Sequence, residues 1–212
     1  MPEIAPSLLA ADVLDLGGEI RRMTEDGLNR LHLDIMDGHF VPNLSFGPDF
    51  CRAIHTAYPG IRLDVHLMTE RPELYIDTFA GYGASSITVH LETVSDPSGI
   101  LKSIHEKGLQ AGLSVKPATP AEKLVPWLDD TDMVLIMTVE PGFGGQALMP
   151  DQIEKIRFLR DAGYTGLIAA DGGVNADNAR MIGEAGADIV IMGTSYFRAE
   201  DRSEVLRAVY GK

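Results

Sequence analysis

Eight short apolar segments alternate with longer amphipathic segments along this chain of 212 residues, and the alternation predicts an α/β fold built on a parallel sheet. Dividing the length by eight leaves about 26 residues per unit, enough for a strand, a helix and two short loops. A chain of this length suits one domain with a large core rather than two small ones. We therefore expect residues 1–212 to form a single (β/α)8 barrel with a parallel eight-stranded core.

The apolar segments define the expected strands, in chain order. They are residues 3–7, 30–34, 61–66, 87–90, 110–115, 133–137, 166–170 and 189–192. Most are short runs rich in aliphatic residues, which is typical of strands covered by helices on the outside of a barrel.

Helix boundaries are indicated between these strands. Asp96 followed by Pro97 predicts an N-cap with a first-turn proline, and Asp151 with Glu154 resembles a capping box. Helix ends are predicted where glycines precede the next strand. These ends lie at Pro59-Gly60, Gly108, Gly163 and Gly186.

Composition restricts the kinds of partner. The net charge of −13 argues against a protein that binds nucleic acid or anionic membranes over a broad surface. The single cysteine, Cys51, excludes an intramolecular disulfide framework and fits a reducing compartment. No apolar run approaches the roughly 20 residues that cross a bilayer, and residues 1–7 lack the pattern of a signal peptide. We expect a cytoplasmic protein.

Polar residues occur near the carboxyl ends of several predicted strands, where barrel enzymes place their active sites. His32, Asp34, His66 and Asp171 can surround one divalent metal if these strand ends meet. Zinc is favoured, and iron(II), manganese or cobalt would also accept mixed nitrogen and oxygen ligands. Taken singly, either histidine could instead be a hydrogen-bonded core residue.

Two other aspartates have structural interpretations. Asp37 precedes Gly38 and is expected to be a turn residue. Asp64 shares a strand face with His66, and we expect a structural role for it as well.

Glycine-rich turns follow the last three predicted strands, the region where barrels often bind phosphate through backbone amides and a helix N-terminus. A single such loop could be simple turn geometry, but three convergent turns favour a phosphate site. The candidate residues are Gly142, Phe143, Gly144, Gly145, Gly172, Gly173, Gly193 and Thr194, with Ser195 as a further hydroxyl donor.

Three methionines, Met36, Met68 and Met137, lie at strand ends beside these groups. Their thioethers could line the face of a planar intermediate and exclude water, although ordinary core packing would also place methionine there. For any one methionine taken alone, core packing is favoured.

These motifs resemble the ribulose-phosphate 3-epimerases, (β/α)8 enzymes that interconvert D-ribulose 5-phosphate and D-xylulose 5-phosphate. The resemblance covers nearly the whole chain, through residues 6–12, 32–43, 64–68, 137–146, 171–173 and 193–194. It implies a metal held by the four residues named above, substrate contacts from Ser7 and His66, and a homo-oligomer. The three methionines match family positions that surround the substrate, so the resemblance favours the substrate-lining role for them. It also implies a role in pentose phosphate metabolism.

The chain departs from the family pattern at two places. Glu140 stands where the family commonly has asparagine, and Ala169 stands where members often carry glutamate, two residues before Asp171. Residues 90–92 and 193–195 also resemble the allulose-6-phosphate 3-epimerases. A pentulose phosphate is the favoured substrate, and a hexulose phosphate is the alternative.

The predicted chemistry is inversion at C3 of a ketose phosphate. A metal that binds the C2 and C3 oxygens can act as a Lewis acid. Asp34 is expected to remove the C3 proton from one face while Asp171 delivers a proton to the other, with the roles exchanged in reverse. Two more distant alternatives are a sugar-phosphate aldolase or decarboxylase, in which Lys116 forms a Schiff base, and a non-catalytic sugar-phosphate binding protein.

Overall fold

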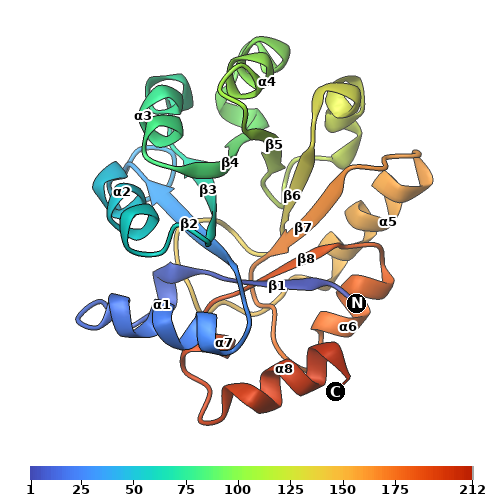
Figure 1. Cartoon of the computed structure of the whole chain (residues 1–212). Coiled ribbons are helices and arrows are strands. Elements are labelled where there is room, and N and C mark those ends of the chain that lie inside the picture. The colour runs from blue at the N-terminus through green and yellow to red at the C-terminus, as the bar shows by residue number, and fades with distance from the viewer. Residues whose placement is uncertain (212) are drawn as a thin grey trace.

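The computed structural model describes residues 1–211, which form a closed ring of parallel strands surrounded by helices (Figure 1). The strands are β1 (Glu3–Pro6), β2 (Arg30–Met36), β3 (Arg62–Met68), β4 (Ala84–His90), β5 (Gln110–Val115), β6 (Met133–Met137), β7 (Leu167–Asp171) and β8 (Ile189–Met192). They are hydrogen-bonded in the order β1-β8-β7-β6-β5-β4-β3-β2. A parallel bridge between Ser7 and His32 joins β1 to β2 and closes the barrel.

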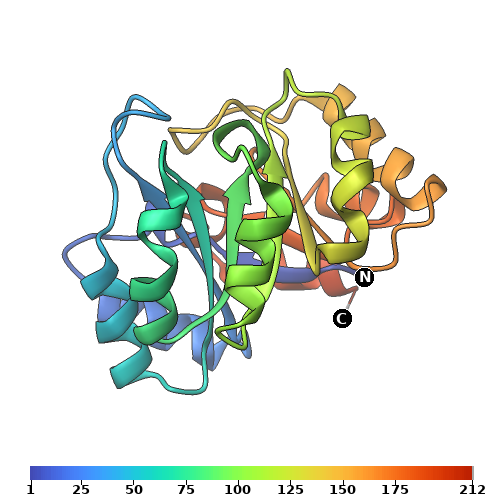
Figure 2. The same ribbon diagram turned by 90° about the horizontal axis from the view of Figure 1, so that it is seen from above.

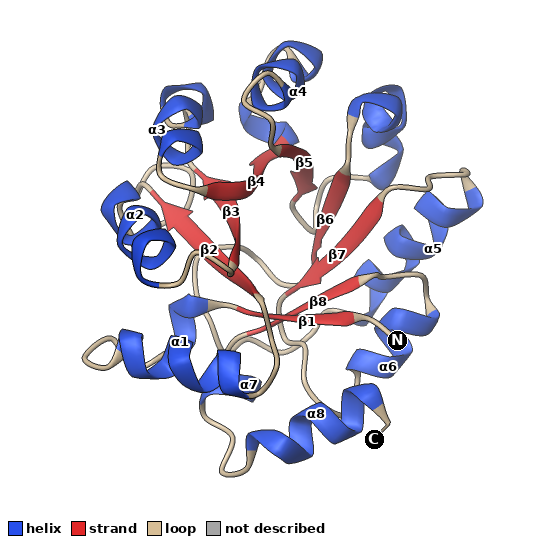
Figure 3. Cartoon of the chain, in the orientation of Figure 1, coloured by secondary structure: helices blue, strands red, loops and turns tan. Residues whose placement is uncertain are grey.

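Helices connect successive strands and cover the outside of the ring (Figure 3). The α-helices are α1 (Leu16–Glu25), α2 (Pro48–Ala57), α3 (Ile76–Gly81), α4 (Pro97–His105), α5 (Ile153–Asp161), α6 (Ala179–Glu184), α7 (Thr194–Phe197) and α8 (Arg202–Tyr210). Between β5 and β6 the connection is a long 3₁₀ helix, η4 (Ala121–Asp130), which contains Pro126. Viewed from above, the helices lie alongside the strands (Figure 2).

The predicted barrel is confirmed, with small differences at the element ends. The strands at 110–115, 133–137 and 189–192 have the predicted bounds. Strands β2 and β3 extend further than predicted, because Met36 continues to pair in register with Met68. Three of the predicted metal ligands, His32, Asp34 and His66, therefore lie within regular sheet.

One of the two predicted helix caps is confirmed, and the other is wrong. The Asp96 side chain accepts a hydrogen bond from the Gly99 N–H at 3.1 Å, and Pro97 is the first residue of α4. Asp151 does not cap α5, because it lies inside a 3₁₀ turn and the helix begins only at Ile153. The 3₁₀ turn Pro150–Gln152 occupies the place where the capping box was expected.

Alternating side chains on β2 and β3 separate two environments. Leu31, Leu33, Leu63, Val65 and Leu67 are fully buried in the large apolar core outside the barrel. Burying each such side chain contributes about 1.5–3 kcal/mol. This outward packing fixes the strands and obliges the residues between them to face the barrel interior.

The barrel interior is itself divided into two halves. An apolar half comes from β6, β7, β8 and β1 and contains Ala5, Met133, Leu135, Met137, Ala169, Ile189 and Ile191, together with Val139 from the loop after β6. Buried polar residues come from β2 to β5: His32, Asp34, Asp64, His66, Ser86, Thr88, His90 and Ser114. Since buried polar groups are costly unless they are paired or bind a ligand, this polar half is the natural place for a functional site.

Across residues 1–211, no helix combines the length and apolar character needed to span a membrane.

Candidate active site

A cavity of about 290 Å³ opens at the carboxyl ends of the strands. The predicted substrate-binding residues all line it, with the exception of His66, which lies fully buried below it. Asp34 and Asp171 also line the cavity, whereas His32 is buried beneath them. The sequence motifs therefore converge on one site.

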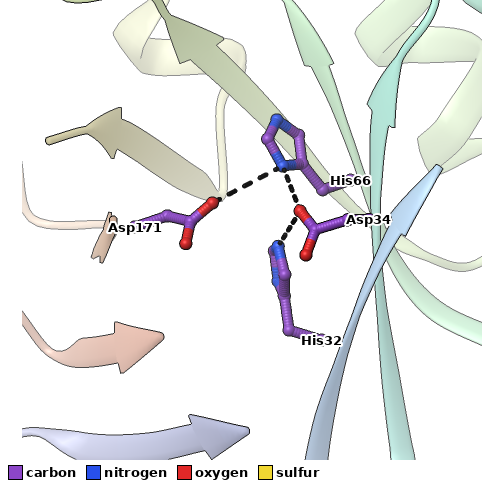
Figure 4. Close-up of side chains that lie close together, drawn as sticks. All are labelled: His32, Asp34, His66 and Asp171. Atoms are coloured by element: carbon purple, nitrogen blue, oxygen red, sulfur yellow. Dashed lines mark hydrogen bonds and ion pairs between the residues drawn. The ribbon is translucent and has the colours of Figure 1, made fainter. Parts of the chain in front are cut away.

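The four predicted metal ligands form one cluster (Figure 4). Each contributes one potential ligand atom, and these atoms lie within 4.8 Å of one another. Asp34 Oδ1 lies 3.3 Å from His32 Nε2 and 3.3 Å from His66 Nδ1, and His66 Nδ1 lies 3.9 Å from Asp171 Oδ2. In Figure 4, Asp171 faces the other three residues from the opposite side of the group.

The donor set suits a divalent cation. Two imidazole nitrogens and two carboxylates are ligands for zinc and related metals. Within the described chain, His32 Nε2 is buried and has no partner that satisfies hydrogen-bond geometry. An orphaned ring nitrogen 3.3 Å from a carboxylate oxygen of Asp34 is what a site for a cation requires, because the cation would satisfy the nitrogen and neutralise the carboxylate.

The orientation of His32 is fixed from its other ring nitrogen. His32 Nδ1 lies 2.8 Å from Asp64 Oδ2, and Asp64 Oδ1 accepts a 2.6 Å hydrogen bond from the Ser86 hydroxyl. All three side chains are buried. Asp64 therefore has the expected structural role: it orients His32, one of the four predicted metal ligands.

Asp34 is held in place by two serines. The Ser7 hydroxyl donates a 2.6 Å hydrogen bond to Asp34 Oδ2, and the Ser45 hydroxyl donates to the Asp34 backbone carbonyl. Ser7 also lines the cavity. The carboxylate therefore keeps one oxygen toward the serine and one toward the histidines.

The pKa values of the two cavity aspartates move in opposite directions. Burial raises the pKa of Asp171 from 3.8 to about 7, and the charge of Asp34 adds to this effect. Burial alone would also raise the pKa of Asp34, but His32 and His66 outweigh it and hold that pKa well below its ordinary value. At neutral pH the pair therefore combines an ionised carboxylate with a carboxyl group that can carry a proton.

Glycine geometry shapes the loops around the cavity. Gly172 and Gly173 have φ angles of +119° and +66°, and a Cβ atom on Gly173 would lie 2.2 Å from the Leu148 backbone nitrogen. Asn43 donates a 2.8 Å hydrogen bond to the Gly142 carbonyl, which joins the loop after β2 to the loop after β6. The Ser195 hydroxyl donates to the Val174 carbonyl at 2.6 Å. These two hydrogen bonds join the segments after β2 and β6, and the segments after β7 and β8, at the cavity mouth.

Two departures from the family pattern lie outside the polar site. Glu140 is exposed and does not belong to the cavity lining of the described chain. Ala169 is fully buried in the apolar half of the barrel. Neither residue presents a new polar group to the cavity.

Lys116 is also directed elsewhere. Its ammonium lies 3.7 Å from the centroid of the Phe40 ring and 3.4 Å from the Phe40 carbonyl oxygen. In the part of the chain that the structure describes, Lys116 is not among the cavity-lining residues. This placement gives the Schiff-base alternative no structural support.

Sequence reasoning did not assign site roles to several residues that the structure brings to the site. Gln146 and Asn175 line the cavity, and His90 lies 2.9 Å from His66 between ring nitrogens. The signal was available for all three, because each lies at or just beyond the carboxyl end of a strand near a recognised motif.

Asp37 behaves as predicted: its side chain accepts from the N–H groups of His39, Phe40 and Glu70.

Similar folds occur among solved structures of barrel enzymes. A 3-keto-L-gulonate-6-phosphate decarboxylase from Vibrio cholerae aligns with a TM-score of 0.75 at 15% identity, over 99% of this chain and 96% of the other. A 3-hexulose-6-phosphate synthase from Salmonella typhimurium aligns with a TM-score of 0.74 at 18% identity, over 99% and 97% of the two chains. At these identities the likeness establishes the barrel fold alone.

The fold and the cluster define a (β/α)8 protein with a candidate metal centre at the barrel mouth. The model of the ribulose-phosphate 3 epimerase family matches residues 3–197, and the chain belongs to that family. Ribulose-phosphate 3-epimerase of Schizosaccharomyces pombe is 42% identical over 206 residues, covering 96% of this chain and 90% of that protein. The Bacillus subtilis enzyme of that name is 39% identical over 216 residues, covering 100% and 99%. The protein is therefore an isomerase, a sugar-phosphate 3-epimerase.

Proposed function

We propose that this protein interconverts D-ribulose 5-phosphate and D-xylulose 5-phosphate by proton transfer at C3. The observation that carries the proposal is the pair of cavity aspartates, Asp34 and Asp171, whose pKa values are displaced in opposite directions. Inversion needs one group to accept a proton and another to supply one. Family membership and the printed names of the relatives support the pentulose phosphate as substrate.

His32, Asp34, His66 and Asp171 would hold a divalent cation, with zinc favoured and iron(II), manganese or cobalt also compatible. When bound, the cation would supply Lewis-acid stabilisation for negative charge on the C2 and C3 oxygens of the ketose. The orphaned nitrogen of His32 supports this assignment. Elemental analysis of the purified protein would identify the metal.

The proton transfers are assigned to side chains of the cavity. Asp34, held ionised beside the histidines, removes the C3 proton from one face of the sugar. Asp171, which comes from β7, delivers a proton to the other face. In the reverse direction the two roles are exchanged, so each turnover ends with the proton on the opposite aspartate.

Binding and shielding come from the remaining cavity residues. The loops that contain Gly142–Gly145, Gly172–Gly173 and Gly193–Thr194 would hold the phosphate through backbone N–H groups. Met36, Met68 and Met137 would cover the planar intermediate and exclude water. Ser7 would contact the substrate while it orients Asp34.

The test uses the metal-loaded protein in D2O, with D-ribulose 5-phosphate and D-allulose 6-phosphate in separate reactions. NMR follows deuterium incorporation at C3 and the appearance of the epimer. We expect faster exchange with the pentulose phosphate. Faster exchange with the hexulose phosphate would replace the substrate assignment, and exchange with neither would overturn the epimerase proposal.

The expected cytoplasmic location and homo-oligomeric state extend this proposal. One relative from Oryza sativa, 42% identical over 215 residues, carries the name of a cytoplasmic isoform. Light scattering coupled to size-exclusion chromatography would measure the number of subunits.

A further inference from the structure

His66 has ring nitrogens in two different surroundings. Nδ1 faces the carboxylates, 3.3 Å from Asp34 Oδ1 and 3.9 Å from Asp171 Oδ2. Nε2 faces away from them and lies 2.9 Å from His90 Nε2. Both imidazoles are fully buried. Two nitrogens at this distance make a hydrogen bond only if one carries a proton and the other offers a lone pair.

The residue beyond His90 determines the direction of that hydrogen bond. His90 Nδ1 lies 3.3 Å from Glu92 Oε2. An ionised carboxylate only accepts, so His90 Nδ1 carries the hydrogen. A neutral His90 then has its lone pair on Nε2 and accepts from the Nε2–H of His66. Asp34 Oδ1, 3.3 Å from His66 Nδ1, competes for a hydrogen on that nitrogen, so the lone pair of His66 is left on Nδ1 once a cation pairs with the Asp34 carboxylate.

The contacts of Glu92 agree with its role as an acceptor. Burial opposes ionisation of Glu92, but hydrogen bonds from His90, Thr119 and the Lys116 backbone outweigh it and lower the Glu92 pKa to about 2. Glu92 is therefore a carboxylate at neutral pH.

Surrounding groups hold the hydrogen-bonded series of Glu92, His90 and His66 in place. The Glu92 carboxylate accepts from the Lys116 N–H at 2.8 Å and from the Thr119 hydroxyl. The Phe40 ring covers His90 at a centroid distance of 4.6 Å. The opposite polarity, in which His90 donates to His66, would put an unprotonated Nδ1 against the carboxylate of Glu92.

We propose that Glu92 and His90 are positioning residues that hold His66 in its Nε2–H tautomer and thereby present Nδ1 to the cation. The inference rests on the metal site proposed above and assigns roles to two residues outside the four ligands. A carboxylate acts directly on His32, where Asp64 holds the hydrogen on Nδ1. Glu92 acts on His66 through a second imidazole and holds the hydrogen on Nε2. Hydrogen-bond partners of this kind orient ligands and tune their basicity.

The test compares wild type with Glu92→Gln and His90→Leu. Glu122→Gln is the matched control, since Glu122 is an exposed carboxylate that, like Glu92, acts electrostatically on Lys155. Cobalt(II) affinity is measured by competition with a chromophoric chelator. Nitrogen-15 NMR of the zinc-loaded proteins reports whether His90 carries its hydrogen on Nδ1 and accepts from His66 at Nε2.

We expect His90 to carry its hydrogen on Nδ1 in zinc-loaded wild type, and we expect a loss of cobalt affinity of about 10- to 100-fold in both site variants but not in Glu122→Gln. We also expect a mixture of His90 tautomers in Glu92→Gln. An Nε2–H tautomer of His90 in zinc-loaded wild type would overturn the inference even if neither variant folds. Unchanged affinity and tautomer in Glu92→Gln would also overturn it and leave the metal site standing. A wild-type protein that binds no cobalt would overturn the metal site itself, and the inference with it.

Discussion

His32 Nδ1 lies 2.8 Å from Asp64 Oδ2, inside the barrel and out of contact with solvent. A carboxylate in this position holds the hydrogen on Nδ1 and turns Nε2 of the same ring toward Asp34. The pairing follows from sheet register, since His32 and Asp64 are directly opposite each other on β2 and β3.

Replacing Asp64 with asparagine should weaken cation binding. The amide keeps the volume of the side chain but removes the charge that favours Nδ1–H, so we expect metal affinity to fall about 10- to 100-fold. Chelator competition measures the loss, with exposed Asp129→Asn as the control for net charge. Equal affinities in the two variants would contradict the orienting role of Asp64.

Replacing Asp34 or Asp171 with asparagine should separate the two halves of the reaction. Epimerisation needs both groups, so each variant is expected to lose about 10²- to 10⁴-fold in turnover. Each should retain C3 deuterium exchange with only one of the two epimers, because one base remains. Metal content is measured for every variant, since both aspartates belong to the proposed ligand set. Exchange with both epimers in either variant would contradict the assignment of one aspartate to each face.

Metal affinity should rise with pH. Asp171, with its pKa raised to about 7, and His32, with its pKa raised well above 6.5, are protonated in the metal-free protein at pH 6. Burial works against the protonated form of His32, but Asp34 and Asp64 outweigh it. His32 must lose its proton to become a ligand, and the cation competes with the proton on Asp171, so binding releases protons.

The sign of the effect can be stated for each group. Below pH 7 both protons are released, and affinity should increase by up to about 100-fold per pH unit. Above pH 7 Asp171 is already ionised, and the slope should fall toward that of His32 alone. Titration calorimetry in buffers of different ionisation enthalpy counts the protons. An affinity that is flat between pH 6 and pH 8 would contradict these protonation states.

Asp171 should make the stability of the metal-free protein depend on pH. In the metal-free protein, the folded pKa of Asp171 lies above its ordinary 3.8, so the folded state binds the proton more tightly than the unfolded chain. Its contribution is therefore fully present below pH 3.8 and is lost as pH rises through about 7. Urea unfolding of the Asp171→Asn variant, compared with wild type at pH 5 and pH 8, isolates this contribution. An identical change in unfolding free energy for both proteins would exclude it.

The fold and the ligand cluster could be predicted from the sequence for one reason. Both depend on side chains that point alternately outward and inward along a strand. Outward leucines and inward polar residues on β2 and β3 follow from a period of two, and parallel strands bring their carboxyl ends together. The link between His66 and His90 was not predictable in this way. It depends on ring orientations and a register between β3 and β4 that is irregular at Leu63 and Asp64.

Loop detail was also beyond the reach of local patterns. The predicted capping box at Asp151 failed because a 3₁₀ turn intervenes before α5. Similarly, the departure at Glu140 suggested a change in the site, but the loop directs that residue to the surface. Each outcome was decided by tertiary contacts of the loop rather than by the sequence of its own few residues.

The three cavity methionines should affect turnover more than stability. Leucine is close to methionine in volume, so Met36→Leu, Met68→Leu and Met137→Leu should each change the free energy of unfolding by less than about 1.5 kcal/mol. Their branched, less polarisable side chains should still alter kcat, because all three line the cavity. Met181→Leu, at a largely exposed methionine, is the control. Unchanged kinetics in all three cavity variants would refute the substrate-lining role.

Two glycines of the proposed phosphate site should respond differently to alanine. Gly173 has a φ of +66°, and its added Cβ would meet the Leu148 backbone at 2.2 Å, so Gly173→Ala should destabilise the fold by about 1–3 kcal/mol. Gly144 has no heavy atom within 4 Å of its added Cβ, so Gly144→Ala should leave stability within about 0.5 kcal/mol of wild type. Because Gly144 lines the cavity, the new methyl group should nevertheless raise KM for the sugar phosphate by crowding the phosphate. Thermal unfolding and steady-state kinetics on the same preparations separate the two effects. A Gly144→Ala protein with wild-type KM would place the phosphate away from this loop.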